Sequence, residues 1–267
     1  MSTRGGTFFR RIDIHFPWLK LVVVCLIGLL AILDLLDLTI SSTTSPSIRA
    51  RLAPMSRHVR IRRDYSDKKL VALTFDDGPS ADTTPRLLDI LFEKDVRATF
   101  FMLGDRARNN PDIVRRIAKE HNTVASHTMR HQNLVKLSSA AVEADINESK
   151  SVFNTILGHA PELIRPPYGN VNDLVRSKVG TPIILWSVDP ADWQNQDPET
   201  ILSTIKAQIH DGAIILMHDI YQSSVDAVPI IIDSLRADGY EFVAVPELAK
   251  ARKINLAPGI TYYNFRP

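Results

Sequence analysis

The chain has 267 residues, 45% of them hydrophobic, and a formal net charge of +2. This length is enough for one sizeable core, with room for additional segments. A charge so close to balance gives no support for a nucleic-acid partner, and we expect none. The single cysteine, Cys25, excludes an intrachain disulfide, so the folded part must depend on its core and on any metal that it binds.

A short apolar run lies close to the N-terminus. Residues 21–33 carry no charge, and several basic residues precede them, which is typical of a secretory signal. No small-x-small cleavage site follows closely. We therefore predict that residues 1–40 form a cytoplasmic tail and an uncleaved transmembrane signal anchor, with the rest of the chain outside the cytoplasm on a single membrane pass. A cleaved signal peptide is the first alternative, and a buried core helix is the second.

The segment 41–67 begins rich in Ser, Thr and Pro and then becomes basic, as a linker would. Between Arg49 and Lys69 there are eight Lys or Arg residues and only two Asp. A stretch of this kind could touch an anionic lipid or polymer, but a solvated linker is the simpler interpretation.

The segment 68–250 alternates short apolar strands with amphipathic helices, which predicts one α/β domain with a parallel sheet and outer helices. Seven β/α units suit a distorted barrel better than a doubly wound open sheet, which is the alternative. Asn110 is expected to cap one helix, and Ser138 to begin a long helix that stops at Gly158. Residues 251–267 are expected to form a C-terminal tail. The predicted strands cover 70–75, 96–103, 123–126, 162–165, 183–188, 213–218 and 241–245, and the predicted helices begin near residues 85, 110, 138, 172, 197 and 224.

Unusual polar residues gather where these predicted strands end. The C-terminal ends of parallel strands in an α/β barrel converge on one face, so we expect these side chains to share one site. The set comprises Asp76 and Asp77, His127 and His131, Arg165 to Gly169, Asp189 to Trp193, and His218 with Asp219.

Two histidines in this set have a spacing suited to metal binding. His127 and His131 are four residues apart, which on one helical turn would place both imidazoles on one face. Asp77 would complete a set of two histidines and a carboxylate, a pattern typical of catalytic zinc sites and shared by iron(II) sites. Taken alone, the spacing is more often found in surface or capping histidines.

Asp76 and Asp77 are neighbours in a DDGP sequence that, by itself, indicates a turn. Adjacent carboxylates repel unless one meets a cation, so a metal on Asp77 would leave Asp76 free as a general base. Arg165 could pair with Asp76 and hold it ionised, although 165–169 could equally be a plain proline-rich turn.

Five segments, in order, resemble the motifs of the polysaccharide deacetylases, the NodB-homology type that is also called carbohydrate esterase family 4. The resemblance covers about residues 69–248 and implies a distorted (β/α)7 barrel. The five segments are TFDDGP (74–79), SHTMRH (126–131), RPPYG (165–169), DPADW (189–193) and LMHD (216–219).

The resemblance also implies roles for individual residues. Asp77, His127 and His131 would bind a divalent metal, most simply Zn²⁺, with Co²⁺ or another divalent ion as alternatives. Asp76 looks like the general base and Arg165 like its orienting partner. The remaining implied roles are general acid for His218, tuning of that acid for Asp192, an oxyanion-binding backbone N–H for Tyr168, and a pocket for the acetyl methyl group formed by Trp193 and Leu216.

The implied reaction is hydrolysis of N-acetyl groups from N-acetylglucosamine residues of a polysaccharide, with release of acetate. The segment 212–248 is most similar to peptidoglycan N-acetylglucosamine deacetylases, and a tethered domain outside the cytoplasm favours a cell-wall substrate. Chitin or its oligosaccharides, an exopolysaccharide and acetylated xylan are alternative substrates. Two other classes are disfavoured: an inactive wall-binding module, because the set of site residues is complete, and a phosphatase-like hydrolase, because Gly78 replaces its usual second acid.

Overall fold

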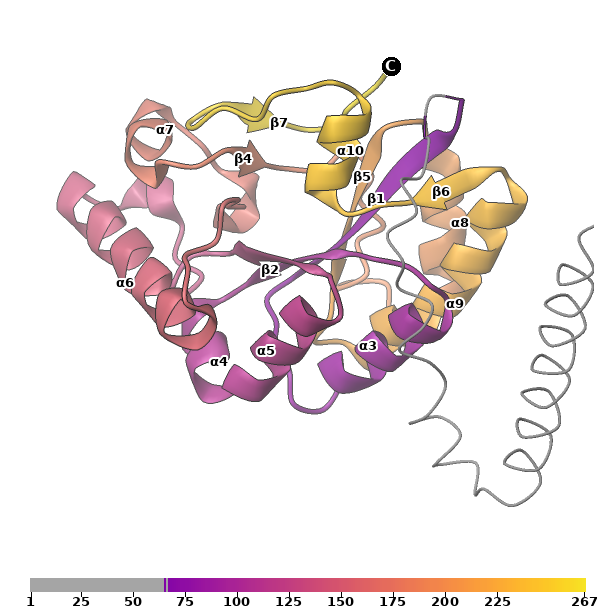
Figure 1. The fold of residues 1–267 in the computed structure, drawn as a ribbon, viewed down its shortest axis with the longest axis horizontal. Helices are drawn as coiled ribbons and strands as arrows, with labels where there is room; N and C mark the ends of the chain where they lie inside the picture. Colours follow the sequence, from indigo (N-terminus) through magenta and orange to yellow (C-terminus); the bar gives the residue numbers. More distant parts are fainter. Residues whose placement is uncertain (1–64, 66) are drawn as a thin grey trace, which may run out of the picture. The chain divides into compact units, whose positions relative to one another are not determined.

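A parallel five-stranded sheet lies at the centre of the computed structural model, which describes Tyr65 and residues 67–267 (Figure 1). Its strands are β1 (Lys69–Asp76), β2 (Thr99–Met102), β3 (Thr123–Ser126), β5 (Ala213–His218) and β6 (Tyr240–Phe242). β1 is the central strand: it pairs with β5 along most of its length, with β2 near its C-terminal end and with β6 near its N-terminal end. β3 pairs with β2. The predicted parallel sheet is confirmed.

The strand pairings continue beyond β3 and return to β5. Ile164 forms single parallel bridges to β3 and to Ile183, the first residue of β4 (Ile183–Ile184). A few residues later, Val188 forms a parallel bridge to β5. The predicted strand 162–165 is therefore reduced to one bridged residue. Prolines flank it on both sides, and a proline has no N–H to donate to a neighbouring strand.

Helices cover the outside of this sheet, as predicted (Figure 1). Ser138 caps the longest of them by accepting a hydrogen bond from the Ala141 N–H, and Gly158 ends it with a φ of 83°. The predicted helices correspond to α3 (Thr84–Glu93), α5 (Pro111–Lys119), α6 (Ser139–Leu157), α7 (Asp173–Val179), α8 (Pro198–Gln208) and α9 (Gln222–Ala237).

Two further helices were not expected, α4 (Gly104–Asn109) and α10 (Val245–Ala251). α4 is short and mostly polar, so its sequence lacks the apolar periodicity that would predict a helix. It ends next to Asn110, whose side-chain amide donates back to the Arg106 carbonyl instead of capping α5. Asn110 thus occupies the N-cap position predicted for it, but its side chain makes no capping hydrogen bond.

The segment 251–267, which we expected to be a tail, folds back onto the domain. It contains β7 (Thr261–Tyr262), which pairs with β4 and lies beside it in Figure 1. Phe265 is only 1% exposed and packs in an apolar cluster with residues of β1 and α10. The core of the domain thus includes the end of the chain.

The two faces of β1 have different surroundings. Its odd-numbered residues 71–75 pack in the apolar cluster that also holds residues of α3 and α9. On the other face, Leu70 and Ala72 lie in a second apolar cluster, and Thr74 and Asp76 follow at alternate positions. This second face changes from apolar to polar toward the C-terminal end of the strand, which is where the candidate site begins.

The predicted signal anchor, residues 1–40, lies outside the described residues, as does nearly all of the predicted linker. No helix within Tyr65 and residues 67–267 is long and apolar enough to cross a membrane.

Candidate active site and metal centre

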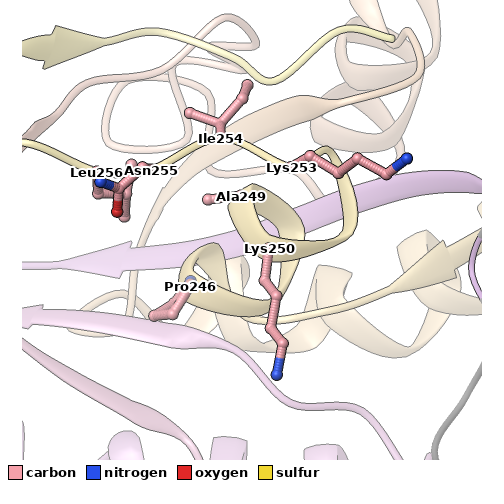
Figure 2. A pocket seen from close by; sticks show the side chains of 7 residues that line it. All are labelled: Pro246, Ala249, Lys250, Lys253, Ile254, Asn255 and Leu256. Carbon is pink, nitrogen blue, oxygen red and sulfur yellow. The ribbon is translucent and has the colours of Figure 1, made fainter.

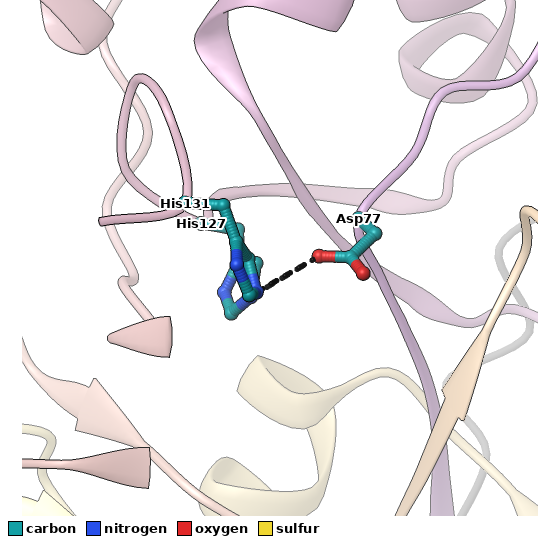
Figure 3. A group of neighbouring side chains, drawn as sticks. All are labelled: Asp77, His127 and His131. Carbon is teal, nitrogen blue, oxygen red and sulfur yellow. Dashed lines mark ion pairs between the residues drawn. The ribbon is translucent and has the colours of Figure 1, made fainter. Parts of the chain in front are cut away.

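The three residues predicted to bind a metal come together in the structure. The Oδ1 atom of Asp77 lies 3.5 Å from Nε2 of His127 and 3.3 Å from Nε2 of His131. One potential ligand atom from each of the three residues lies within 4.8 Å of the others. Figure 3 shows the Asp77 carboxylate, from the turn after β1, facing both imidazole rings, which follow β3. The convergence expected from the strand ends is thus observed.

The histidine pair does not lie on a helix, contrary to the expectation from its spacing. Residues 127–131 form an irregular loop directly after β3. Thr128 and His131 have positive φ angles of 73° and 57°, which turn the chain sharply. The two imidazole centroids are nevertheless 5.1 Å apart. A spacing of four residues is compatible with this loop as well as with a helical turn, so the spacing alone could not distinguish them.

The chemical state of these three groups suits a divalent cation. Oδ1 of Asp77 is buried and accepts no hydrogen bond within the described part of the chain. Nδ1 of His127 lies 2.6 Å from the carbonyl oxygen of Arg165, so this nitrogen carries the hydrogen and Nε2 is left as an acceptor. Burial lowers the pKa of His127 to about 3, which keeps the imidazole neutral. Neutral imidazole and carboxylate are the forms that bind zinc and related ions.

Arg165 is fully buried and fixes the position of Asp76. Its Nη1 donates to Oδ1 of Asp76 at 2.6 Å and to the Thr74 hydroxyl at 2.9 Å. Its Nε and Nη2 donate to the carbonyl oxygens of Ile184 and Leu185, at 3.0 and 3.1 Å. The guanidinium thus connects Thr74 and Asp76 of β1 to the C-terminal end of β4. The pairing predicted for Arg165 and Asp76 is present.

Asp76 itself is only 3% exposed. Burial raises its pKa, and the charges of Arg165 and His218 oppose that rise. Oδ2 of Asp76 lies 3.8 Å from Nε2 of His127, so the carboxylate borders the metal centre. Asp76 therefore combines a buried carboxylate, a fixed orientation and proximity to the metal ligands, which is what a general base requires.

His218 ends β5 and is held by Asp192. Nδ1 of His218 lies 2.8 Å from Oδ1 of Asp192, and the His218 backbone N–H donates to Oδ2 at 2.8 Å. The Ser224 hydroxyl, in the first turn of α9, donates to the same Oδ2 at 2.6 Å. Burial works against the charge of His218, but the hydrogen bond and charge of Asp192, with the charges of Asp76 and Asp77, raise its pKa to about 9. The imidazole is therefore protonated at neutral pH.

Asp219 lies behind the Asp77 turn. Its side chain is fully buried, and burial raises its pKa to about 7. The Thr84 hydroxyl donates to its carboxylate, and the Thr83 hydroxyl donates to its backbone carbonyl. A Cβ atom on Gly78 would lie 2.3 Å from both carboxylate oxygens, so only glycine fits between Asp77 and this group. This contact gives a structural reason for the glycine in DDGP.

The residues predicted to contact substrate lie in different environments. Tyr168 is 61% exposed, has a φ of 63°, and packs edge-on against the His131 ring at 4.8 Å. Trp193 is 53% exposed, whereas Leu216 on β5 is only 4% exposed. Tyr221 was not singled out from the sequence, yet its ring lies 6.0 Å from that of His218. The contacts of Tyr168, Trp193 and Leu216 with substrate stay predictions.

A separate hollow of about 420 Å³ lies between α10 and the segment that follows it (Figure 2). Its lining includes no carboxylate, imidazole or thiol, so it offers none of the groups that a hydrolytic site needs. The lining residues are Pro246, Ala249, Lys250, Lys253, Ile254, Asn255 and Leu256.

The geometry above can now be compared with known proteins. Residues 63–181 match the polysaccharide deacetylase family. The chain is also 39% identical, over 194 residues, to a peptidoglycan-N-acetylglucosamine deacetylase of Bacillus cereus, and the match covers 70% of each protein. The chain belongs to the polysaccharide deacetylase family. The family resemblance inferred from the five sequence motifs is thereby confirmed.

Other members of the polysaccharide deacetylase family are similarly close. The peptidoglycan-N-acetylmuramic acid deacetylase PdaC of Bacillus subtilis is 41% identical over 187 residues, which cover 70% of this chain and 40% of PdaC. The chain therefore spans less than half the length of that relative. A solved structure described as T48 deacetylase with substrate has a TM-score of 0.72 and 36% identity, and covers 75% of this chain and 99% of its own. The described α/β unit thus has the fold of this family.

Proposed function

We propose that this chain removes N-acetyl groups from N-acetylglucosamine residues of peptidoglycan by metal-dependent hydrolysis, releasing acetate. The observation that carries this proposal is the grouping of the Asp77, His127 and His131 ligand set with two charged pairs at the C-terminal ends of the strands. The Asp76–Arg165 pair supplies a base, and the His218–Asp192 pair supplies an acid. Hydrolysis of an amide needs both.

Similarity to cell-wall enzymes supports peptidoglycan as the substrate. The Bacillus cereus relative acts, by its name, on the N-acetylglucosamine of peptidoglycan, and PdaC on its N-acetylmuramic acid. Because the identity to PdaC is 41%, N-acetylmuramic acid is a second candidate sugar in the same polymer. The predicted anchor at residues 1–40 would place the enzyme at the outer face of the membrane, next to the wall.

Asp77, His127 and His131 would hold the divalent ion, for which we propose Zn²⁺, with Co²⁺ as a functional substitute. When bound, such an ion lowers the pKa of a coordinated water toward neutrality and polarises the acetyl carbonyl. With three protein ligands, such an ion would keep open positions for water and substrate.

Asp76 takes the proton of the attacking water as the new C–O bond forms. Arg165 orients the Asp76 carboxylate toward the metal centre and balances its charge. The backbone N–H of Tyr168 would donate to the oxyanion that develops on the acetyl oxygen. Trp193 and Leu216 would enclose the acetyl methyl group.

His218 completes the reaction as the general acid. Its imidazolium donates a proton to the sugar nitrogen as the C–N bond breaks, because an amine is a poor leaving group without that proton. Asp192 keeps His218 charged and oriented. The products are acetate and a polysaccharide with a free amine.

Acetate release from purified peptidoglycan tests the proposal, with mass spectrometry of the digested sugars to identify the deacetylated residue. We expect glucosamine in the product and a greatly reduced release by the Asp76→Asn variant. Free muramic acid amines would favour the second candidate. Release only from chitin, from exopolysaccharide or from acetylated xylan would overturn peptidoglycan as the substrate.

A further inference from the structure

The loop that carries His127 and His131 lacks regular secondary structure. Thr128 and His131 adopt positive φ angles of 73° and 57°, which are unfavourable for residues with a Cβ atom. Such a conformation persists only where the surrounding structure holds it. The neighbours of this loop therefore determine whether His131 reaches the point where Asp77 and His127 meet.

One support for the loop comes from the first turn of α4. The N–H of Gly104 donates to the Thr128 carbonyl at 2.9 Å, and the N–H of Asp105 donates to the Met129 carbonyl at 3.1 Å. A Cβ atom on Gly104 would lie 2.3 Å from the Met129 sulfur, so the loop packs directly against this turn. The carbonyl groups of the loop are thus held by backbone donors.

The second support comes from the buried face of α6. Oδ1 of Asp145 accepts the Met129 N–H at 2.8 Å. One turn later, the Ser149 hydroxyl lies 3.0 Å from the Ser126 hydroxyl, which in turn accepts the Thr128 N–H at 3.2 Å. Residues four apart on a helix share a face, so both polar groups of α6 reach the same loop.

Asp145 is an unusual residue for its position. It is 3% exposed and lies in a stripe of α6 whose other members include Val142, Ile146 and Phe153. Burial raises its pKa, and the hydrogen bond from Met129, with the backbone N–H and the charge of Arg130, opposes that rise. A buried carboxylate is costly, and an apolar side chain here would suit the core better. Its bond to Met129 offers a reason for its presence.

We propose that Asp145 is a positioning residue for the metal centre, which acts by holding the Met129 N–H so that His131 joins Asp77 and His127. This inference rests on the metal centre of the proposed function. It assigns Asp145 no contact with metal or substrate.

Zn²⁺ affinity, measured on the purified chain by competition with a chromophoric chelator, tests this role. Loss of a residue that supports metal ligands typically weakens binding about 10–100-fold, and we expect this of Asp145→Ala. Asp145→Asn keeps an oxygen acceptor for Met129 and should retain most of the affinity. Asn147→Ala, on the exposed face of the same helix, is the matched control and should bind Zn²⁺ as the unmodified chain does.

Asp145→Glu provides a second variant in case Asp145→Ala does not fold, because glutamate is a good helix former but places its carboxylate one methylene too far. We expect weaker Zn²⁺ binding and a changed visible spectrum of the Co²⁺-loaded protein. Unmodified affinity and spectrum in a folded Ala or Glu variant would overturn the proposal, as would an Asn variant as weak as Ala. If the unmodified chain binds Zn²⁺ but releases no acetate from peptidoglycan, the proposed function fails while the role of Asp145 stands.

Discussion

Two charged pairs border the metal centre. In one pair the carboxylate of Asp76 is the proposed proton acceptor, and in the other the imidazolium of His218 is the proposed proton donor. In the Asp76–Arg165 pair, the arginine side chain is fully buried and bound by backbone carbonyls as well as by the carboxylate. In the His218–Asp192 pair, the aspartate is fully buried and the histidine is 14% exposed toward the site. In each pair the partner with no exposed surface, Arg165 or Asp192, orients the other side chain. We propose that the two pairs use the same arrangement with opposite charges, so that Asp76 acts as the base and His218 as the acid.

The largest expected effect comes from removing the base. Asp76→Asn keeps the size of the side chain and can still accept from Arg165, but it cannot take a proton. We expect kcat on peptidoglycan to fall by about 10²–10⁴-fold while Zn²⁺ remains bound. Steady-state kinetics with metal analysis of the same sample would check this. A near-normal kcat for Asp76→Asn would show that Asp76 is not the base, and the proposed contrast between the two pairs would fail.

Removal of the acid should have an effect that depends on the leaving group. His218→Ala should lower kcat on the N-acetyl amide by about 10²–10⁴-fold, because the amine cannot depart unprotonated. An activated aryl acetate ester, whose phenolate leaves without a proton, should be hydrolysed with a much smaller loss. Equal losses on the amide and the ester would contradict the role of His218.

Asp192, the hydrogen-bond partner of His218, should control how kcat/KM depends on pH. Asp192 raises the pKa of His218 to about 9, so His218 carries its proton below that pH and loses it above. Asp192→Asn removes the charge, lowers the His218 pKa, and should move the alkaline limb of kcat/KM to lower pH. An unchanged limb would mean that His218 is not the group that titrates there.

The smallest expected effect concerns the hydroxyl that supports Asp192. Ser224→Ala removes one of its hydrogen bonds and should destabilise the protein by about 1 kcal/mol. The same limb should shift slightly to higher pH, because Asp192 loses a hydrogen-bond donor and interacts more strongly with protonated His218. Thermal unfolding and the pH profile would detect these changes. Ser223→Ala, the preceding residue of α9, is the control and should leave both unaltered.

The metal ligands could be predicted because each follows an apolar strand, and parallel strands bring their C-terminal ends together. The Asp76–Arg165 pair was predictable for the same reason. The backbone conformation between His127 and His131 could not be predicted. The positive φ angles at Thr128 and His131 depend on contacts of this loop with α4 and α6. Periodicity describes regular elements, and this loop is not one.

The supporting residues were missed for a related reason. Ser224 and Asp145 lie far along the chain from the groups that they bind, so only the fold reveals the contacts. Asp145 could have been noticed in the sequence, because it places a carboxylate on the helical face that also carries Val142, Ile146 and Phe153. The core position of Phe265 could not be foreseen, since a single aromatic near the C-terminus carries no periodicity.

The most direct test of the central claim measures bound metal and acetate release on the same samples of the unmodified chain, Asp77→Ala and His127→Ala. The unmodified chain should bind about one divalent ion, as expected for one set of three protein ligands, and should release acetate from peptidoglycan. Both variants should lose the metal and the activity together. A folded variant that carries no metal and still releases acetate at the unmodified rate would contradict the account.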